Sequence, residues 1–165
     1  MVNKNKNNKV KEPEMTDQAF SLYVLLQQAK DAVYNARVKE LTVYGLTPRE
    51  GAMLRGIAII GSRATPAMLA RWVYRKPHTV AGILKRMQKK GYINLNKDED
   101  IKNITRVSLT NKGKKAYQIT LKRELIHDIF DNLTTIKRSQ LKNLLIEVRD
   151  SALAKTGDNI QRPFP

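Results

Sequence analysis

The residues best suited to chemistry gather in a short basic stretch of this 165-residue chain, residues 75–90. No acidic residue interrupts the stretch, and its cations are Arg75, Lys76, Lys85, Arg86, Lys89 and Lys90. Guanidinium and ammonium groups bind phosphate oxygens and the acceptor edges of nucleic-acid bases. The same stretch carries an apolar stripe, so it predicts a helix with one buried face and one strongly positive face.

The predicted helix, from Pro77 to Gly91, has two opposite faces. Its apolar face consists of Val80, Ile83, Leu84 and Met87. At about 100° per residue, the opposite face consists of His78, Gly82, Lys85 and Lys89, flanked by Thr79 and Arg86. A glycine inside a helix costs about 1 kcal/mol relative to alanine, and a surface of close approach would justify that cost. A solvated basic helix with a permissive glycine is the alternative.

The wider charge distribution favours a polyanionic partner. The formal net charge is +16 and the sequence pI is about 10.2. Such a charge attracts nucleic acid or an anionic membrane surface. No Asp or Glu lies between Glu50 and Asp98, an interval that contains the basic stretch. Because the charge run coincides with the predicted helix, we expect nucleic acid to be the partner.

Catalysis and metal binding have little support in the sequence. The chain has no cysteine, which excludes disulfides, thiolate metal sites and cysteine nucleophiles. Its two histidines, His78 and His127, lie in different predicted elements, and no glycine-rich phosphate loop occurs. We therefore expect a protein that is not an enzyme and holds no metal or cofactor. No apolar run reaches membrane-spanning length, so the expected location is the cytoplasm.

Hydrophobic periodicity and helix-start motifs predict the elements that position the basic helix. Two threonine-proline pairs, at 47–48 and 65–66, are typical helix starts with a threonine cap. After the basic helix the period changes to alternation, which predicts a β-hairpin. The predicted elements are helices from Phe20, Thr47, Thr65, Pro77, Thr110 and Thr134, and strands over 92–96 and 105–109.

This order of elements predicts a mainly α fold with a small β-hairpin wing. It is typical of a winged helix-turn-helix, here placed between N- and C-terminal dimerisation helices. The second helix of such a turn enters the major groove of DNA. The predicted divisions are a basic arm over 1–15, one domain over 16–154 with its winged part at about 47–117 and dimerisation helices at about 17–40 and 118–154, and a tail over 155–165.

Four segments, in this order and spacing, resemble the MarR-type winged-helix regulators, named for multiple antibiotic resistance. They are "LTPREGAMLRGIA", "TPAMLARWV", "TVAGILKRMQKKGYI" and "RVSLTNKGKKAY". The resemblance covers roughly Phe20 to Ala154. It implies a homodimeric, sequence-specific regulator that represses a palindromic promoter site on double-stranded DNA and is released by a small phenolic or anionic ligand. The alternative is an architectural protein that coats DNA without sequence preference.

The resemblance makes the basic helix the recognition helix. The expected DNA-binding residues are Arg75, Lys76, His78, Thr79, Gly82, Lys85, Arg86, Lys89, Lys102 and Arg106. Lys76 stands where the family has a serine or threonine cap, so we expect a DNA phosphate to bind the first-turn amides. A pH-sensing role for His78 is less favoured than that of an ordinary exposed histidine.

The predicted wing departs from the family pattern. Relatives carry Asp-x-Arg shortly before the second strand, whereas Ile101 and Asn103 occupy those positions here. A minor-groove role would therefore pass to Lys102 or Arg106. The tip, 98–100, is Asp-Glu-Asp, so we expect it to point away from DNA or to contribute little specificity.

Apolar residues at the two ends of the chain exceed what a small winged core can cover, which indicates a homodimer. The expected dimerisation residues are Phe20, Leu22, Ile126, Ile129, Phe130, Leu133, Leu141, Leu144, Leu145 and Val148. The resemblance also implies a ligand cleft between the dimerisation helices and the winged part. Its candidate lining residues, for which ordinary packing is the alternative, are Tyr23, Tyr34, Arg37, Met53 and Trp72.

Overall fold

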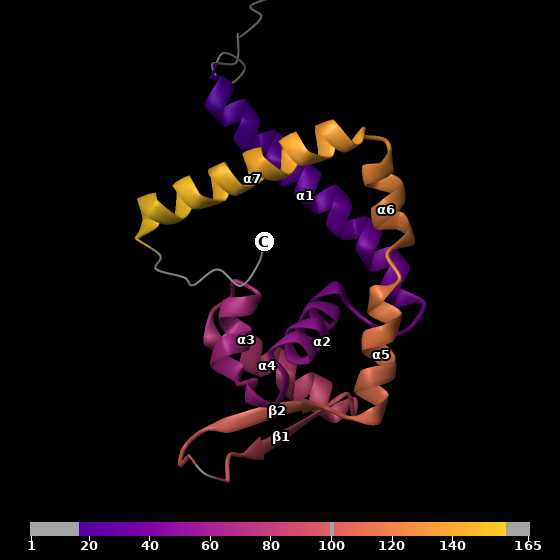
Figure 1. Ribbon diagram of the computed structural model, residues 1–165, viewed down its shortest axis with the longest axis vertical. Helices are drawn as coiled ribbons and strands as arrows, with labels where there is room; N and C mark the ends of the chain where they lie inside the picture. The colour runs from indigo at the N-terminus through magenta and orange to yellow at the C-terminus, as the bar shows by residue number, and fades with distance from the viewer. Residues whose placement is uncertain (1–16, 100, 158–165) are drawn as a thin grey trace, which may run out of the picture.

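The computed structural model describes residues 17–99 and 101–157 (Figure 1). The predicted basic arm over 1–15, and residues 158–165 of the predicted tail, lie outside this range. The described elements are α1 (Gln18–Thr42), α2 (Pro48–Ile60), the 3-10 helix η2 (Gly61–Arg63), α3 (Pro66–Trp72), α4 (Pro77–Lys89), β1 (Ile93–Lys97), β2 (Thr105–Leu109), α5 (Asn111–Leu121), α6 (Glu124–Asp131) and α7 (Thr135–Thr156). The predicted helices and the predicted hairpin are confirmed.

Threonine side chains cap the starts of α2, α3, α5 and α7. Thr47 Oγ1 accepts a hydrogen bond from the backbone N–H of Glu50 at 3.2 Å. In return, the Glu50 carboxylate accepts from the N–H of Thr47 at 3.0 Å, which completes a capping box. Thr65, Thr110 and Thr134 cap the other three helices with one bond each. These local motifs therefore set where the helices begin.

Helices α2 to α5 and the hairpin form a winged body around one core. Its fully buried side chains include Met53, Leu69 and Leu84, one each from α2, α3 and α4. β1 and β2 pair antiparallel, and the N–H of Val107 on β2 donates to the carbonyl of Ala64 at 2.9 Å. This bond attaches the wing to the segment between η2 and α3, so the wing is fixed relative to the helices.

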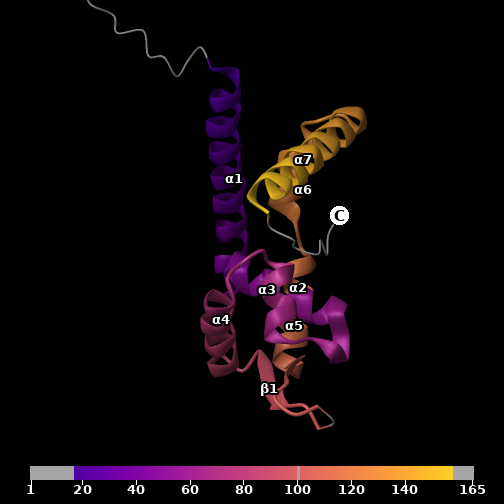
Figure 2. The same cartoon turned by 90° about the vertical axis from the view of Figure 1, so that its left-hand side faces the viewer.

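Helices α1, α6 and α7 extend from the winged body (Figures 1 and 2). α1 packs against α6, whereas α7 makes no extensive contact with another described element. Many large apolar side chains on α1 and α7 are therefore exposed, among them Leu22, Leu25, Ile136, Leu144 and Val148. Although α1 and α7 are the longest described helices, neither these nor the others are apolar enough to cross a membrane.

The start of α5 packs so closely on the preceding strand region that only glycine fits at position 113. A Cβ placed on Gly113 would lie 1.9 Å from the carbonyl oxygen of Tyr92. Gly82 on α4 is different, because a Cβ there would meet only Arg86 Nη1, at 3.7 Å.

We expect Gly113→Ala to lower the free energy of unfolding by about 3 kcal/mol, because backbone must move to admit the methyl group. Gly82→Ala should instead raise the free energy of unfolding by about 0.5–1 kcal/mol, through the better helix propensity of alanine. Urea unfolding followed by circular dichroism measures both changes. A Gly113→Ala variant as stable as the wild type would contradict the close packing.

Candidate nucleic-acid interface

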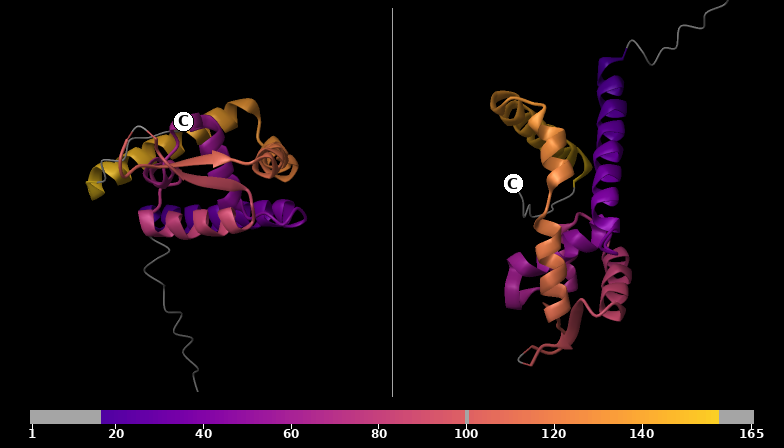
Figure 3. Two further views of the ribbon diagram at one scale, coloured as in Figure 1. Left: turned by 90° about the horizontal axis from the view of Figure 1, so that it is seen from below. Right: turned by 90° about the vertical axis from the view of Figure 1, so that its right-hand side faces the viewer.

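Helix α4 has a buried apolar face and an exposed basic face. Val80 and Met87 are completely buried, and Ile83 and Leu84 are nearly so. This apolar seam packs against α2, α3 and β1. Because the seam uses all of the large apolar side chains of α4, the rotation of the helix about its axis is fixed. Seen from below, α4 and the hairpin both lie open on the underside of the winged body (Figure 3).

Most of the predicted DNA-binding residues come together on the outer side of α4. Gly82 lies half-buried among them. The exposed members, which we call the α4 surface, are Arg75, Lys76, His78, Thr79, Lys85, Arg86 and Lys89. No neighbouring group inside the described protein requires a glycine at position 82. The α4 surface therefore combines long basic side chains with one position, Gly82, at which an external molecule can approach the helix backbone.

The turn from α3 to α4 has an unusual backbone conformation. Tyr74 has a φ of 57°, in the left-handed region where glycine is usual. Its N–H donates to the carbonyl of Arg71 at 3.1 Å, and the N–H of Arg75 donates to that of Ala70 at 3.0 Å. These two bonds close α3 as a Schellman motif. Lys76 then starts α4 without a side-chain cap, since lysine has no hydrogen-bond acceptor.

An open hollow of about 750 Å³ lies beside this turn. Arg71, Arg75, Lys76 and Thr79 contribute polar groups to it, and Tyr74 lines it as well. Arg71 and Tyr74 are not among the residues that the sequence predicts to bind DNA. Arg71 lies within the acid-free interval, which was a usable signal, but no local pattern predicts a left-handed tyrosine. The hollow extends the α4 surface with further groups that can bind phosphate.

One cation of the basic stretch has an internal role. The Lys90 ammonium donates to the Glu50 carboxylate at 2.7 Å and to the carbonyl of Gly45 at 3.4 Å. Glu50 is 5% exposed, and its second oxygen accepts from the N–H of Thr47. The carbonyl of Lys90 also accepts from the Lys112 ammonium at 2.8 Å. Lys90 therefore anchors the end of α4 to the start of α2.

Two charged residues of the wing, Arg106 and Asp98, have partners inside the protein. The Arg106 guanidinium pairs with the Asp98 carboxylate and donates to the carbonyl of Arg63 at 3.1 Å. Asp98 also accepts from the N–H of Ile101 at 2.7 Å. The Asp98 carboxylate therefore organises the turn of the wing, and the orientation of the acidic tip toward or away from DNA stays a prediction. Lys102 is exposed on that turn, and residue 100 lies outside the described range.

A cavity of about 460 Å³ lies between α1, α2 and the α5–α6 junction. It combines four cations with an aromatic ring, and we call it the basic cleft. Those lining residues are Lys30, Arg37, Arg55, Arg123 and Tyr34. Two of the five predicted ligand-binding residues, Tyr34 and Arg37, therefore line one cleft between the winged body and the terminal helices.

The other three predicted ligand-binding residues do not line the basic cleft. Met53 is buried in the core of the winged body. Trp72 packs against α2, where a Cβ placed on Gly56 would approach the indole Cδ1 to 2.9 Å. Tyr23 is exposed on α1, with its ring centroid 5.9 Å from that of Phe20. Met53 and Trp72 do not line the cleft because their apolar side chains pack between helices instead.

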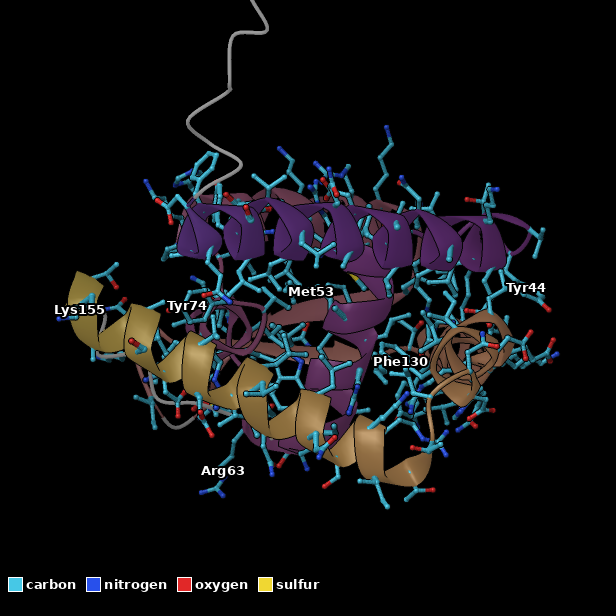
Figure 4. All side chains as sticks on the ribbon, turned by 90° about the horizontal axis from the view of Figure 1, so that it is seen from above. Tyr44, Met53, Arg63, Tyr74, Phe130 and Lys155 are labelled. Atoms are coloured by element: carbon cyan, nitrogen blue, oxygen red, sulfur yellow. The ribbon has the colours of Figure 1, made fainter. Side chains whose placement is uncertain are left out.

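The predicted dimerisation residues are incompletely covered within the single chain. The exposed ones are Phe20, Leu22, Leu144, Leu145 and Val148. The half-buried ones are Ile126, Ile129, Phe130, Leu133 and Leu141. Seen from above, Phe130 lies on the inner side of α6, near α7 (Figure 4). Phe130, Leu141 and Leu145 line an open groove of about 470 Å³.

Comparison with known proteins relates this architecture to a family. No family model and no curated protein matches the chain. The organohalide-sensing RdhR transcriptional regulator, in its 2,4-dichlorophenol-bound form, is 26% identical with a TM-score of 0.84, covering 100% of this chain and 98% of that one. MarR from E. coli, as a mutant complexed with operator DNA, is 20% identical with a TM-score of 0.73, covering 78% and 93%. The chain has the MarR-type winged-helix fold.

The likeness extends beyond the winged body. S. aureus MepR in complex with DNA has a TM-score of 0.70 at 18% identity, over 78% of this chain and 96% of that chain. Like MarR at 20% identity, it establishes the fold alone. The RdhR likeness covers 100% of this chain, so the described terminal helices are arranged as in that regulator. The MarR-type resemblance in the sequence is therefore confirmed.

The paired wing residues generate a test of their internal role. Arg106→Ala should lower the free energy of unfolding by about 1–3 kcal/mol, because the mostly buried Asp98 carboxylate loses its charged partner. Lys102→Ala, on the same wing, should change it by less than about 0.5 kcal/mol, because that side chain is exposed. Urea denaturation compares the two variants. Equal unfolding midpoints would show that the Asp98–Arg106 pair does not support the wing.

Proposed function

We propose that this protein is a homodimeric, sequence-specific DNA-binding regulator of transcription, and that it represses a promoter by occupying a palindromic site. The observation that carries this proposal is the α4 surface: a rigidly oriented helix face with long cations around a glycine. A helix of this diameter enters the major groove, where Arg and Lys donate to the N7 and O6 acceptors of guanine.

The residues of the α4 surface divide by reach and position. Lys85 and Arg86 lie beside Gly82, so their donors would meet base edges. Arg75 and Lys76 precede the helix beside the hollow at the turn, so they would bind backbone phosphates. His78 and Thr79 lie in the first turn, where either contact is open to them. The DNA-bound MarR and MepR structures share the fold and support this placement of α4.

The proposed homodimer rests on the uncovered apolar surface of the terminal helices. In a single chain Leu22, Leu144 and Val148 stay exposed to water, which carries a cost that a partner chain removes. A two-fold dimer presents two copies of α4 to half-sites about one helical turn apart, roughly 34–36 Å. Protein symmetry then requires a palindromic operator.

Fluorescence-anisotropy binding tests the proposal directly. The duplex upstream of the protein's own gene is compared with a scrambled duplex at low and near-physiological salt. A sequence-specific regulator keeps a preference of about a thousandfold or more as salt rises. If the two duplexes bind alike and both weaken with salt, the protein coats DNA non-specifically, as the charge of +16 alone would allow.

Gly82 provides a substitution with opposite effects on stability and binding. Gly82→Ala fits within the protein, so the folded state should gain stability. The same methyl group would hold α4 away from the groove, so we expect affinity for the specific duplex to fall by about tenfold or more. Anisotropy and urea unfolding on the same sample measure both. Unchanged affinity would remove Gly82 from the interface.

We further propose that a small aromatic anion regulates DNA binding from the basic cleft. The cleft places Lys30, Arg55 and Arg123 around Tyr34, a combination that suits a phenolate, and its volume of about 460 Å³ lies in the range of ligand pockets. The RdhR structure that resembles this chain contains 2,4-dichlorophenol, which supports this ligand class. The ligand need only prefer a dimer whose recognition helices are wrongly spaced for DNA.

Calorimetric titration with 2,4-dichlorophenol tests the cleft. Lys30→Gln should weaken binding by about tenfold, because it removes a charged hydrogen-bond donor from the lining. Lys39→Gln removes the same charge from an exposed position on α1 outside the lining and should leave binding unchanged. Equal effects of the two substitutions, or no heat with the wild type, would exclude the basic cleft as the site for this ligand.

A further inference from the structure

Two connections join the winged body to the terminal helices, and one of them is held by the side chain of Arg37. One connection is the α1–α2 turn, which contains Gly45 with a φ of 67°. The other is the α5–α6 junction, where Lys122 is extended and Arg123 has a φ of −144° and a ψ of 36°. In Figure 1, α5 and α6 form a column beside the lower end of α1, with the junction between them.

Arg37 ties α1 to this junction through backbone carbonyls. Its Nη2 donates to the carbonyl of Thr120 at 2.5 Å, and its Nη1 donates to that of Lys122 at 2.7 Å. Nη1 also pairs with the Glu40 carboxylate on α1. The carbonyls at the end of α5 carry the negative end of the helix dipole, so a guanidinium is a favourable partner for them.

The tie is shielded from water and has a demanding geometry. The Arg37 side chain is 16% exposed, so its charge-assisted hydrogen bonds are screened less than those of a surface pair. A planar guanidinium reaches two carbonyls at once only if α5 ends at one distance and angle from α1. Apolar packing at this junction is incomplete on the α6 side, because no residue of α6 is fully buried in the single chain, so the Arg37 tie adds to the support that buried Leu41 of α1 gives from the core.

From these observations we infer that Arg37 is a positioning residue that sets the separation of the two recognition helices in the dimer. This inference rests on the proposed homodimeric DNA-binding function. The terminal helices hold the two protomers together, and the winged body carries α4, so the angle at the α5–α6 junction decides where each α4 lies. Arg37 also lines the basic cleft. An anion bound there would compete with the carbonyls of Thr120 and Lys122 for the Arg37 guanidinium. Ligand binding in the basic cleft would thereby change the separation of the two recognition helices.

A distance measurement tests this role without DNA. The chain contains no cysteine, so Lys115→Cys, at an exposed position on α5, introduces a single spin-label site in each protomer. Double electron–electron resonance on the dimer should give one narrow distance distribution with wild-type Arg37. Arg37→Gln should broaden it, because the glutamine amide cannot span both carbonyls. Arg37→Lys, which keeps the charge and can reach only one carbonyl at a time, should give an intermediate width.

The matched control is Lys30→Gln, which removes a charge from the same cleft, where its ammonium contacts Gln27 and Asp31 of α1 rather than the junction. Lys30→Gln should leave the distance distribution narrow.

Selection from random-sequence DNA then tests whether the separation of the two recognition helices determines which half-site separation the protein binds. The wild type should prefer one half-site separation over those one base pair longer or shorter by about tenfold, and Arg37→Gln should reduce that preference to about threefold.

The outcomes separate this inference from the proposed function. If Arg37→Gln remains folded with a distribution as narrow as the wild type, the positioning role is overturned, whatever the DNA result. If Arg37→Gln does not fold, a narrow distribution for Arg37→Lys overturns the role in the same way. A wild type that is monomeric also overturns it. If the distribution broadens but the wild type selects no paired half-sites, the tie stands and the proposed operator recognition fails.

Discussion

The burial of one face of α4 is the constraint on which the rest of the structure depends. Val80, Ile83, Leu84 and Met87 fill the space left by α2, α3 and β1, so α4 has one rotation that satisfies the core. That packing also fixes the direction in which the basic side chains on the other face of α4 point. A basic helix free to rotate could hold DNA only through its charge, whereas a helix with fixed rotation can present particular side chains to particular bases.

The positive charge of the chain serves two different purposes. Lys90 and Arg106 pair with mostly buried carboxylates, and Arg37 pairs with Glu40 and with carbonyls at a helix end. Lys90 and Arg106 stabilise the winged body, and Arg37 holds it against the terminal helices. Lys85 and Arg86 instead face outward from α4. Net charge alone therefore overstates the surface available to a polyanion, and the interface must be counted residue by residue.

The features predicted well from the sequence are the local ones. Threonine caps with a following proline locate helix starts, and apolar periodicity identifies the buried face of α4, because both depend on residues within one or two turns. The Asp98–Arg106 pair joins the two sides of the hairpin, and Arg37 binds Thr120 at the end of a distant helix. Hydrophobic periodicity does not predict such contacts, because it reports only which face of one element is buried. Tyr74 also escaped prediction, because its left-handed conformation is imposed by the turn around it and not favoured by its type.

Glu50 has a consequence for how the protein opens locally. One carboxylate oxygen completes the cap of α2, and the other holds Lys90, which lies 40 residues further along the chain at the end of α4. Fraying of either helix end leaves a buried carboxylate without one of its partners, which penalises partial opening. The start of α2 and the end of α4 therefore belong to one cooperative unit. Their amide hydrogens should exchange with solvent together, as a single sub-global opening, although they are far apart in sequence.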